Sequence, residues 1–203
     1  MSVEIAISTS LPLKLDDLHK SFEWSLDNAT GKTLSVGSQA TPKNFRLIDC
    51  KAFCEENIIR VVEWNSLDVI HTIPYIATSY VWKGNKKSQF SDSFAIEGAT
   101  DGDRFNIEVF RLLCVTTLDH DAQYLWLDKF CIMQTNREDK NWQIQNMANI
   151  YKNSSWCAVL LGGLGGLVGL DETTTWINRS WTLQEALLPR RVYCIFKWDQ
   201  GPG

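Results

Sequence analysis

Strand and helix signals alternate along the chain from Phe45 to Lys197, and this alternation is the feature that most restricts the fold. Short apolar runs of strand length separate stretches in which apolar residues recur at helical spacing. Such alternation predicts a mostly parallel central sheet with helices on both faces, because parallel neighbours need a crossover that is usually helical. We therefore expect one α/β domain over 45–203. Residues 1–44 are expected to form an N-terminal extension with little structure of its own.

The periodicity of apolar residues, together with capping and helix-breaking residues, places the expected elements. Asp101 to Asp103 are expected to cap a helix whose apolar stripe begins at Phe105. Thr135-x-x-Glu138 is interpreted as a capping box for a helix that reaches about Lys152. A last helix is expected over 178–188, ended by Pro189. The expected strands are 45–49 and 58–64, which could pair as a hairpin at the edge of the sheet, and 75–82, 124–128, 156–161 and 191–197.

Composition and charge exclude several classes of function. The chain has 20 basic and 24 acidic residues in 203, a formal net charge of −4, and no block of Lys or Arg. The sequence therefore lacks the clustered Lys and Arg residues that are typical of a nucleic-acid-binding protein. No apolar run approaches the roughly 20 residues that span a bilayer. The first 20 residues lack the basic start and apolar run of a secretory signal, so we expect an intracellular, cytoplasmic protein.

The six cysteines and the glycine-rich run are weak signals for ligand sites. Cys50 and Cys54 form a C-x3-C, but no second Cys/His pair follows at a metal-site spacing, so no metal site is expected. Reduced thiols in a cytosol-like compartment are the expected state. The glycines over 162–169 fail the G-x-G-x-x-G test, because Val168 takes the last position. A mobile connection is favoured over a phosphate-binding loop.

Candidate site residues follow from the rule that ligands bind at the carboxyl ends of parallel strands. Ser79, Tyr80 and Trp82 end the first expected core strand, where they could hold a planar ring and a ribose, or equally be core residues. Asp128 closes the next core strand and could contact a ribose or a water, or instead pair with Arg179 or cap a helix. For Arg179 we favour the structural role of holding Asp128 or a helix terminus.

Glu185 is the one carboxylate on an otherwise inward helical stripe. Trp181, Gln184, Glu185 and Leu188 lie at i, i+3, i+4 and i+7, so they share one helix face. Burial beside aromatic side chains would raise the pKa of Glu185 and suit it to acid–base work or to stabilising a cation. The spacing alone favours the alternative that Glu185 points to solvent or pairs with Arg190. A catalytic role requires the carboxylate to open into a cleft and not to be locked in an internal ion pair.

Three segments, in order, resemble the HET (heterokaryon incompatibility) domain of fungal incompatibility proteins. They are YIATSYVW at 75–82, YLWLD at 124–128 with its continuation to Tyr151, and RSWTLQE at 179–185. The resemblance covers about Phe45 to Lys197. Two positions depart from the family pattern: Lys83 is inserted between Trp82 and Gly84, and Met133 stands where the family commonly has an acidic residue.

The resemblance implies an intracellular effector of programmed cell death with a flavodoxin-like fold similar to Toll/interleukin-1 receptor (TIR) domains. Ser180-Trp181-x-x-x-Glu185 is similar to the TIR helix that bears a Trp and the glutamate essential in NAD-cleaving members. It implies that Glu185 is catalytic and that NAD⁺ is a substrate, with no separate cofactor. The substrate would be held by Ser79, Tyr80, Trp82, Asp128, Arg179 and Trp181. The alternative is a non-catalytic module that self-associates and recruits a partner protein, with a regulatory region following in a longer chain.

Overall fold

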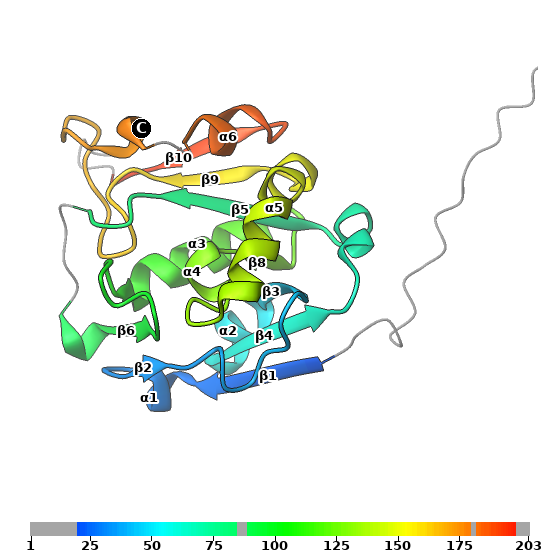
Figure 1. Cartoon of the computed structure of the whole chain (residues 1–203). Coiled ribbons are helices and arrows are strands. Elements are labelled where there is room, and N and C mark those ends of the chain that lie inside the picture. The colour runs from blue at the N-terminus through cyan, green and yellow to red at the C-terminus, as the bar shows by residue number, and fades with distance from the viewer. Residues whose placement is uncertain (1–19, 85–88, 180–181, 198–203) are drawn as a thin grey trace, which may run out of the picture.

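The computed structural model describes residues 20–84, 89–179 and 182–197. A seven-stranded sheet crosses the molecule, and Figure 1 shows its strands stacked from β1 to β10. In spatial order they are β1 (Lys20–Ser25), β4 (Ile58–Trp64), β3 (Phe45–Asp49), β8 (Tyr124–Trp126), β5 (Tyr75–Tyr80), β9 (Cys157–Leu160) and β10 (Val192–Ile195).

The sheet is mixed, with a parallel half and an antiparallel half. Strands β8, β5, β9 and β10 run parallel to one another, as the strand–helix alternation predicts. Strands β1, β4 and β3 pair antiparallel, and β3 is also antiparallel to β8. The α/β class is therefore confirmed. The sequence expectation of a mostly parallel sheet holds for the segment after Tyr75.

The antiparallel half corrects two expectations. Strands β3 and β4 pair as expected and are joined by α2 (Cys50–Glu56), but they do not form the edge, because β1 pairs with β4 along its whole length. Residues 20–44 also have structure of their own, including α1 (Leu26–Ala29) and β2 (Thr33–Leu34). Strand β1 alternates polar residues with Phe22 and Trp24, which pack on the core, and so short an alternation is a weak signal in sequence.

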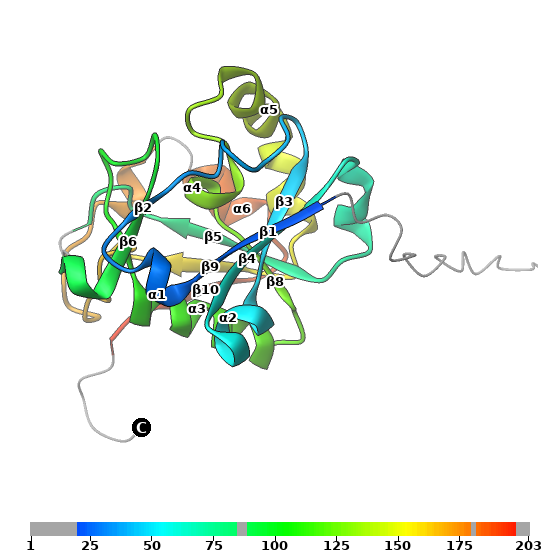
Figure 2. The same ribbon diagram turned by 90° about the horizontal axis from the view of Figure 1, so that it is seen from below.

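Helices cover both faces of the sheet, and Figure 2 shows them on opposite sides of it. One face carries α2 and α3 (Ile107–Asp119), which pack together. The other carries α4 (Asp128–Cys131), α5 (Arg137–Asn153) and α6 (Thr182–Leu187), with α6 beside α5. A small second sheet joins β2, β6 (Ser93–Ile96) and β7 (Phe105–Asn106). Single 3₁₀ turns are η2 (Leu67–His71), η3 (Phe90–Asp92) and η4 (Trp176–Asn178).

The expected helix starts are displaced by one to a few residues. Asn106, not the 101–103 segment, caps α3, since its side chain accepts from the backbone N–H groups of Glu108 and Val109. Asn136, not Thr135, caps α5 and accepts from the N–H of Asp139. Asparagine is as good a cap as Asp or Thr, so sequence cannot choose among adjacent candidates. In the last expected helix, residues 180–181 lie outside the described part.

Within the described residues, no helix is long and apolar enough to cross a membrane. The core contains stacked and edge-to-face aromatic rings. Each of the four rings of Phe94, Phe105, Phe110 and Phe130 contacts the other three. Because these rings come from β6, β7, α3 and α4, they join the small sheet to the helices α3 and α4.

Candidate functional site

A cavity of about 300 Å³ lies beyond the carboxyl ends of β5 and β8, where the parallel-sheet rule predicts a ligand site. Its polar lining combines Asp128 and Glu185 with Arg179, Lys140 and Gln134. Its apolar lining comes mainly from the segment after α4 and from the inner side of α5. The full set is Trp82, Asp128, Ile132, Gln134, Lys140, Ile144, Met147, Arg179 and Glu185.

Glu185 is the most deeply placed carboxylate of this cavity, with only 4% of its surface exposed. The Ser79 hydroxyl donates to its Oε2 at 2.5 Å, and the Trp176 indole N–H donates in turn to Ser79 Oγ at 2.7 Å. Burial raises the pKa of Glu185, whereas the Ser79 hydrogen bond and the Arg179 charge act in the opposite direction. Glu185 is therefore buried, and the alternative that its spacing alone favours, a carboxylate that points to solvent, is wrong.

Arg179 holds Glu185 in an ion pair. Its Nη1 and Nη2 donate to the two carboxylate oxygens at 3.2 and 3.4 Å, and Nη1 also donates to the carbonyl oxygen of Tyr80. The partner of Glu185 is thus Arg179 and not Arg190. The condition set above for a catalytic role is met in part: the carboxylate of Glu185 lines the cavity, but it is also held in an internal ion pair.

Asp128 faces the same cavity from the first turn of α4. The Tyr80 hydroxyl and the backbone N–H of Lys129 both donate to its Oδ1, the latter at 2.6 Å. Burial raises the pKa of Asp128, while these two hydrogen bonds lower it. Strand β8 ends at Trp126, so Asp128 begins a helix and does not close a strand. The side chain of Arg179 makes its ion pair with Glu185 and affects Asp128 only through its charge.

The predicted residues Ser79 and Tyr80 lie behind the cavity wall. Both are buried in β5, with 1% and 3% of their surfaces exposed, and neither is among the lining residues. Each donates a hydrogen bond to a carboxylate that lines the cavity: Ser79 to Glu185, and Tyr80 to Asp128. Trp82 does line the cavity and is half-buried. Trp181 lies outside the described residues.

Lys129 is a buried cation next to the site that the sequence argument missed. Its Nζ donates to the carbonyl oxygen of Asp103 at 2.6 Å and lies 4.4 Å from the centre of the Trp82 ring. Only 1% of its surface is exposed, and burial lowers its pKa to about 8. A cation held against one face of Trp82 fixes the orientation of that ring. The only sequence signal was its place directly after Asp128.

The glycine-rich loop after β9 packs tightly and does not form an open anion cradle. Gly84 and Gly162 approach so closely that a Cβ on Gly84 would lie 1.7 Å from the carbonyl oxygen of Gly162. Gly163 has φ +86°, and a Cβ there would lie 2.8 Å from the Asp103 carboxylate. That carboxylate accepts the backbone N–H of Gly84 at 2.6 Å. The Asp103 carboxylate thus occupies the space beside this loop where an anion would bind, and the glycines permit close packing.

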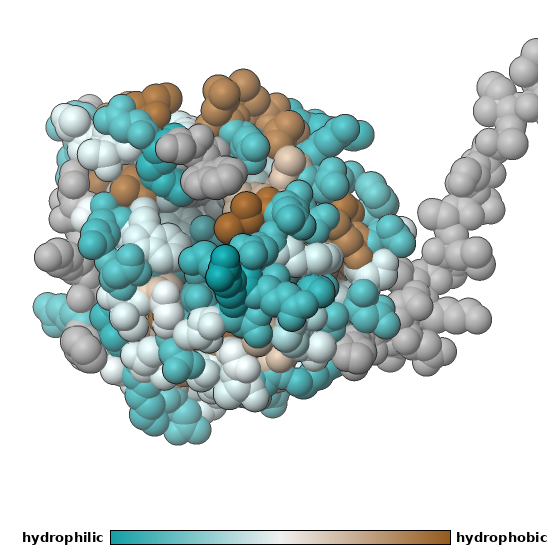
Figure 3. Space-filling model, viewed as in Figure 1, coloured by the Kyte–Doolittle hydropathy of each residue, from teal (hydrophilic) through white to brown (hydrophobic). Residues whose placement is uncertain are grey.

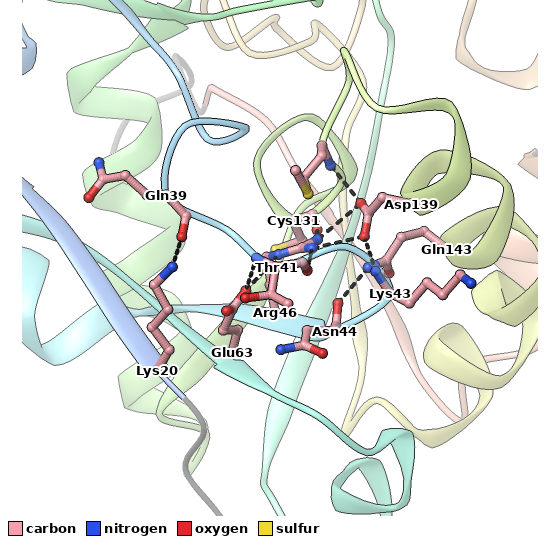
Figure 4. A network of polar contacts seen from close by, with 11 residues as sticks. Lys20, Gln39, Thr41, Lys43, Asn44, Arg46, Glu63, Cys131, Asp139 and Gln143 are labelled. Atoms are coloured by element: carbon pink, nitrogen blue, oxygen red, sulfur yellow. Dashed lines mark hydrogen bonds and ion pairs between the residues drawn. The ribbon is translucent and has the colours of Figure 1, made fainter.

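Figure 4 shows a buried ionic network around Arg46. Arg46 donates to both carboxylate oxygens of Asp139, at 2.8 and 3.1 Å, to Glu63 at 3.2 Å and to the carbonyl oxygen of Cys131 at 2.7 Å. Asp139 also accepts the backbone N–H of Met133 at 2.9 Å. The segment that carries Ile132 and Gln134 into the cavity is therefore tied to the start of α5. Sequence reasoning missed this network, because charged residues are rarely expected in a core.

The comparisons with known proteins identify one family. Residues 75–173 match the model of the family described as heterokaryon incompatibility protein (HET). No curated protein and no solved structure gives a match, so the TIR resemblance stays a prediction. The matched segment begins with β5 and contains Trp82 and Asp128, while Arg179 and Glu185 follow it in the chain. Residues 75–173 of this chain are therefore similar to the heterokaryon incompatibility family.

Proposed function

We propose that this chain acts in the cytoplasm in fungal heterokaryon incompatibility as an effector of programmed cell death, by cleaving NAD⁺ at the nicotinamide–ribose bond. The family match supports the biological role. One observation carries the chemical part: Glu185 is a buried carboxylate that still lines a cavity at the carboxyl edge of the parallel strands. A charge in such a low-dielectric site stabilises a developing cation far better than it would in water.

The lining of the cavity suits one half of a dinucleotide. Its volume lies near the lower end of the roughly 300–1,000 Å³ range of ligand sites, so nicotinamide and its ribose would fill it. Trp82, whose ring is held by Lys129, offers a flat surface for the nicotinamide ring. Ile132, Ile144 and Met147 form an apolar wall, and the exposed Lys140 at the rim can pair with the diphosphate.

Cleavage requires water and releases nicotinamide, ADP-ribose and a proton. The bond between ribose C1′ and the pyridinium nitrogen breaks, and its electron pair leaves on nicotinamide, which becomes neutral. The oxocarbenium-like ribose is stabilised by the Glu185 carboxylate until a water oxygen bonds to C1′. Arg179 supports this role, because its charge favours the ionised form of Glu185 against the effect of burial. Asp128 would accept the proton of the attacking water.

The test is release of nicotinamide from NAD⁺ by the purified protein, measured by chromatography at low and high protein concentration so that assembly is included. We expect release by the wild type and a loss of at least about 100-fold in Glu185→Gln, the size of effect seen when one transition-state contact is removed. Glu138→Gln, which changes an exposed carboxylate on α5, serves as the matched control and should keep full activity. Equal rates in the wild type and Glu185→Gln would remove the catalytic claim.

A non-catalytic self-association module is the second candidate, and two observations favour it. Arg179 already occupies both oxygens of Glu185, as expected of a structural ion pair. The outer side of α6 exposes Leu183 and Leu187, at 68% and 70%, and Figure 3 shows apolar surface gathered over that helix. Cell killing that survives Glu185→Gln but is lost in Leu183→Ser/Leu187→Ser would favour this candidate. The opposite pattern would favour the enzyme.

A further inference from the structure

Three thiols meet on the face of the sheet opposite to the cavity. Cys50 and Cys54 come from α2, and Cys114 comes from the neighbouring α3 (Figure 2). The Cys114 thiol lies within hydrogen-bonding reach of both of the others. Cys50 and Cys114 are fully buried, whereas Cys54 is partly exposed and is therefore the point of entry for a reagent. No residue of this cluster takes part in the proposed NAD⁺ site.

The surroundings of Cys54 favour its thiolate. The hydrogen bond from Cys114 and the charge of Arg111 lower the pKa of Cys54 to about 7, against the opposing effects of burial, Glu55 and Asp119. Arg111 is itself held in place, because its guanidinium lies 4.9 Å from the centre of the Phe53 ring and donates to Asn57 Oδ1 at 3.1 Å. A partly exposed thiol beside a fixed cation and a second thiol has the features of an oxidation-sensitive cysteine.

We propose that Cys54 and Cys114 are a reversible oxidation site that reacts with hydrogen peroxide and links α2 to α3. The Cys54 sulfur attacks the peroxide oxygen, which breaks the O–O bond and yields a sulfenic acid and one water. The Cys114 sulfur then attacks the sulfenic sulfur and displaces a second water. One peroxide is thereby reduced by two electrons as two thiols become one disulfide. A dithiol reductant restores the thiols by exchange.

Cys114 is the resolving partner because it comes from a different helix. The Cys54 and Cys114 thiols interact with each other, and the helices that carry them, α2 and α3, pack together. Cys50 and Cys54 lie one turn apart on the same helix. Cys131 and Cys157 are fully buried and burial raises the pKa of both thiols, so they are poor nucleophiles.

The experiment treats the full chain with hydrogen peroxide, blocks free thiols and maps disulfides by mass spectrometry of a non-reducing tryptic digest. A Cys194→Ser background removes the exposed thiol of β10, which could link two molecules. Trypsin cleaves after Lys51 and so separates Cys50 from Cys54. We expect a linked pair of peptides containing Cys54 and Cys114, lost in Cys54→Ser and in Cys114→Ala but retained in the control Cys50→Ala. A Cys50–Cys54 link, or no link at all, would overturn the proposal.

A second measurement does not depend on variants that could fail to fold. In the untreated wild type at pH 7, iodoacetamide should alkylate Cys54 at least about fivefold faster than the more exposed Cys194, because a larger thiolate fraction outweighs the lower nucleophilicity of the more acidic thiol. Burial raises the pKa of Cys194. A rate for Cys54 equal to or below that of Cys194 would contradict an activated thiol.

Discussion

Ser79 donates its hydroxyl hydrogen to the carboxylate of Glu185, 106 positions later in the chain, and this bond joins the end of β5 to α6. Trp176 in turn donates to the Ser79 oxygen, so the Ser79 hydroxyl accepts one hydrogen bond from Trp176 and donates one to Glu185. Ser79, a residue predicted to contact substrate, therefore contacts Glu185 and is not among the residues that line the cavity. The carboxylate that lines the cavity is held from behind by β5 and from the side by Arg179.

The first prediction concerns the pKa of Glu185. Because burial raises it while Ser79 and Arg179 lower it, Ser79→Ala and Arg179→Ala should each raise it further. A ¹³C NMR titration of the Glu185 carboxyl in the three proteins measures this order. Since the folded-state pKa is above the unfolded value, the contribution of Glu185 to stability is present in full below pH 4.5 and falls as pH rises through the folded pKa. A drop in pKa on removing Arg179 would contradict the ion pair.

The second prediction concerns Lys129, whose pKa is lowered to about 8 by burial. Between pH 8 and about 10.5 the unfolded chain binds this proton more tightly than the folded chain, so the free energy of unfolding rises with pH. Lys129→Met should lack that rise. Urea unfolding gives the free energy of unfolding of both proteins from pH 7 to 10.5. The difference between the two proteins isolates the effect of Lys129, because the contributions of the other titrating groups cancel. If the difference in free energy of unfolding is constant with pH, the pKa of Lys129 is not lowered in the folded protein.

The third prediction concerns the buried network of Arg46. Arg46→Met leaves the carboxylates of Glu63 and Asp139 without their cation in the core, which should cost about 3–5 kcal/mol of unfolding free energy. Glu138→Gln removes an exposed ion pair with Lys43 and should cost less than about 1 kcal/mol. Urea denaturation gives both values. Similar losses in the two variants would show that the network adds nothing beyond a surface pair.

The fourth prediction concerns the contact between Gly84 and Gly162. In Gly84→Ala the new methyl group would overlap the Gly162 carbonyl oxygen, so the two loops must separate, and we expect a loss above about 2 kcal/mol. Gly37→Ala is the matched control. Its Cβ would approach Thr135 Oγ1 only to 3.0 Å, a side-chain atom that can move, and the loss should stay below about 1 kcal/mol. Thermal unfolding compares them, and a harmless Gly84→Ala would refute the close packing.

The site was partly predictable because its residues stand at the ends of recognisable elements. Trp82, Asp128 and Glu185 were selected from strand ends and from a helical stripe, and all three line one cavity. Arg179 was expected to hold Asp128 or a helix terminus, yet its hydrogen bonds go to Glu185 and to the carbonyl oxygen of Tyr80. Lys140, Ile144 and Met147 were missed as lining residues, because helical spacing tells which residues share a face but not which cavity that face borders.

The sequence by itself determined the α/β class, the order of the main-sheet strands from Tyr75 onward and the resemblance to the HET family, because apolar periodicity and short motifs are local properties of the chain. The tertiary structure decided which strand forms each edge of the sheet and which cation pairs with Glu185. It also decided that Arg46 lies in the core, where it forms ion pairs with Glu63 and Asp139. Those outcomes depend on distances between residues tens of positions apart. Burial then changes the energy of each charge in a way that only its neighbours in space determine.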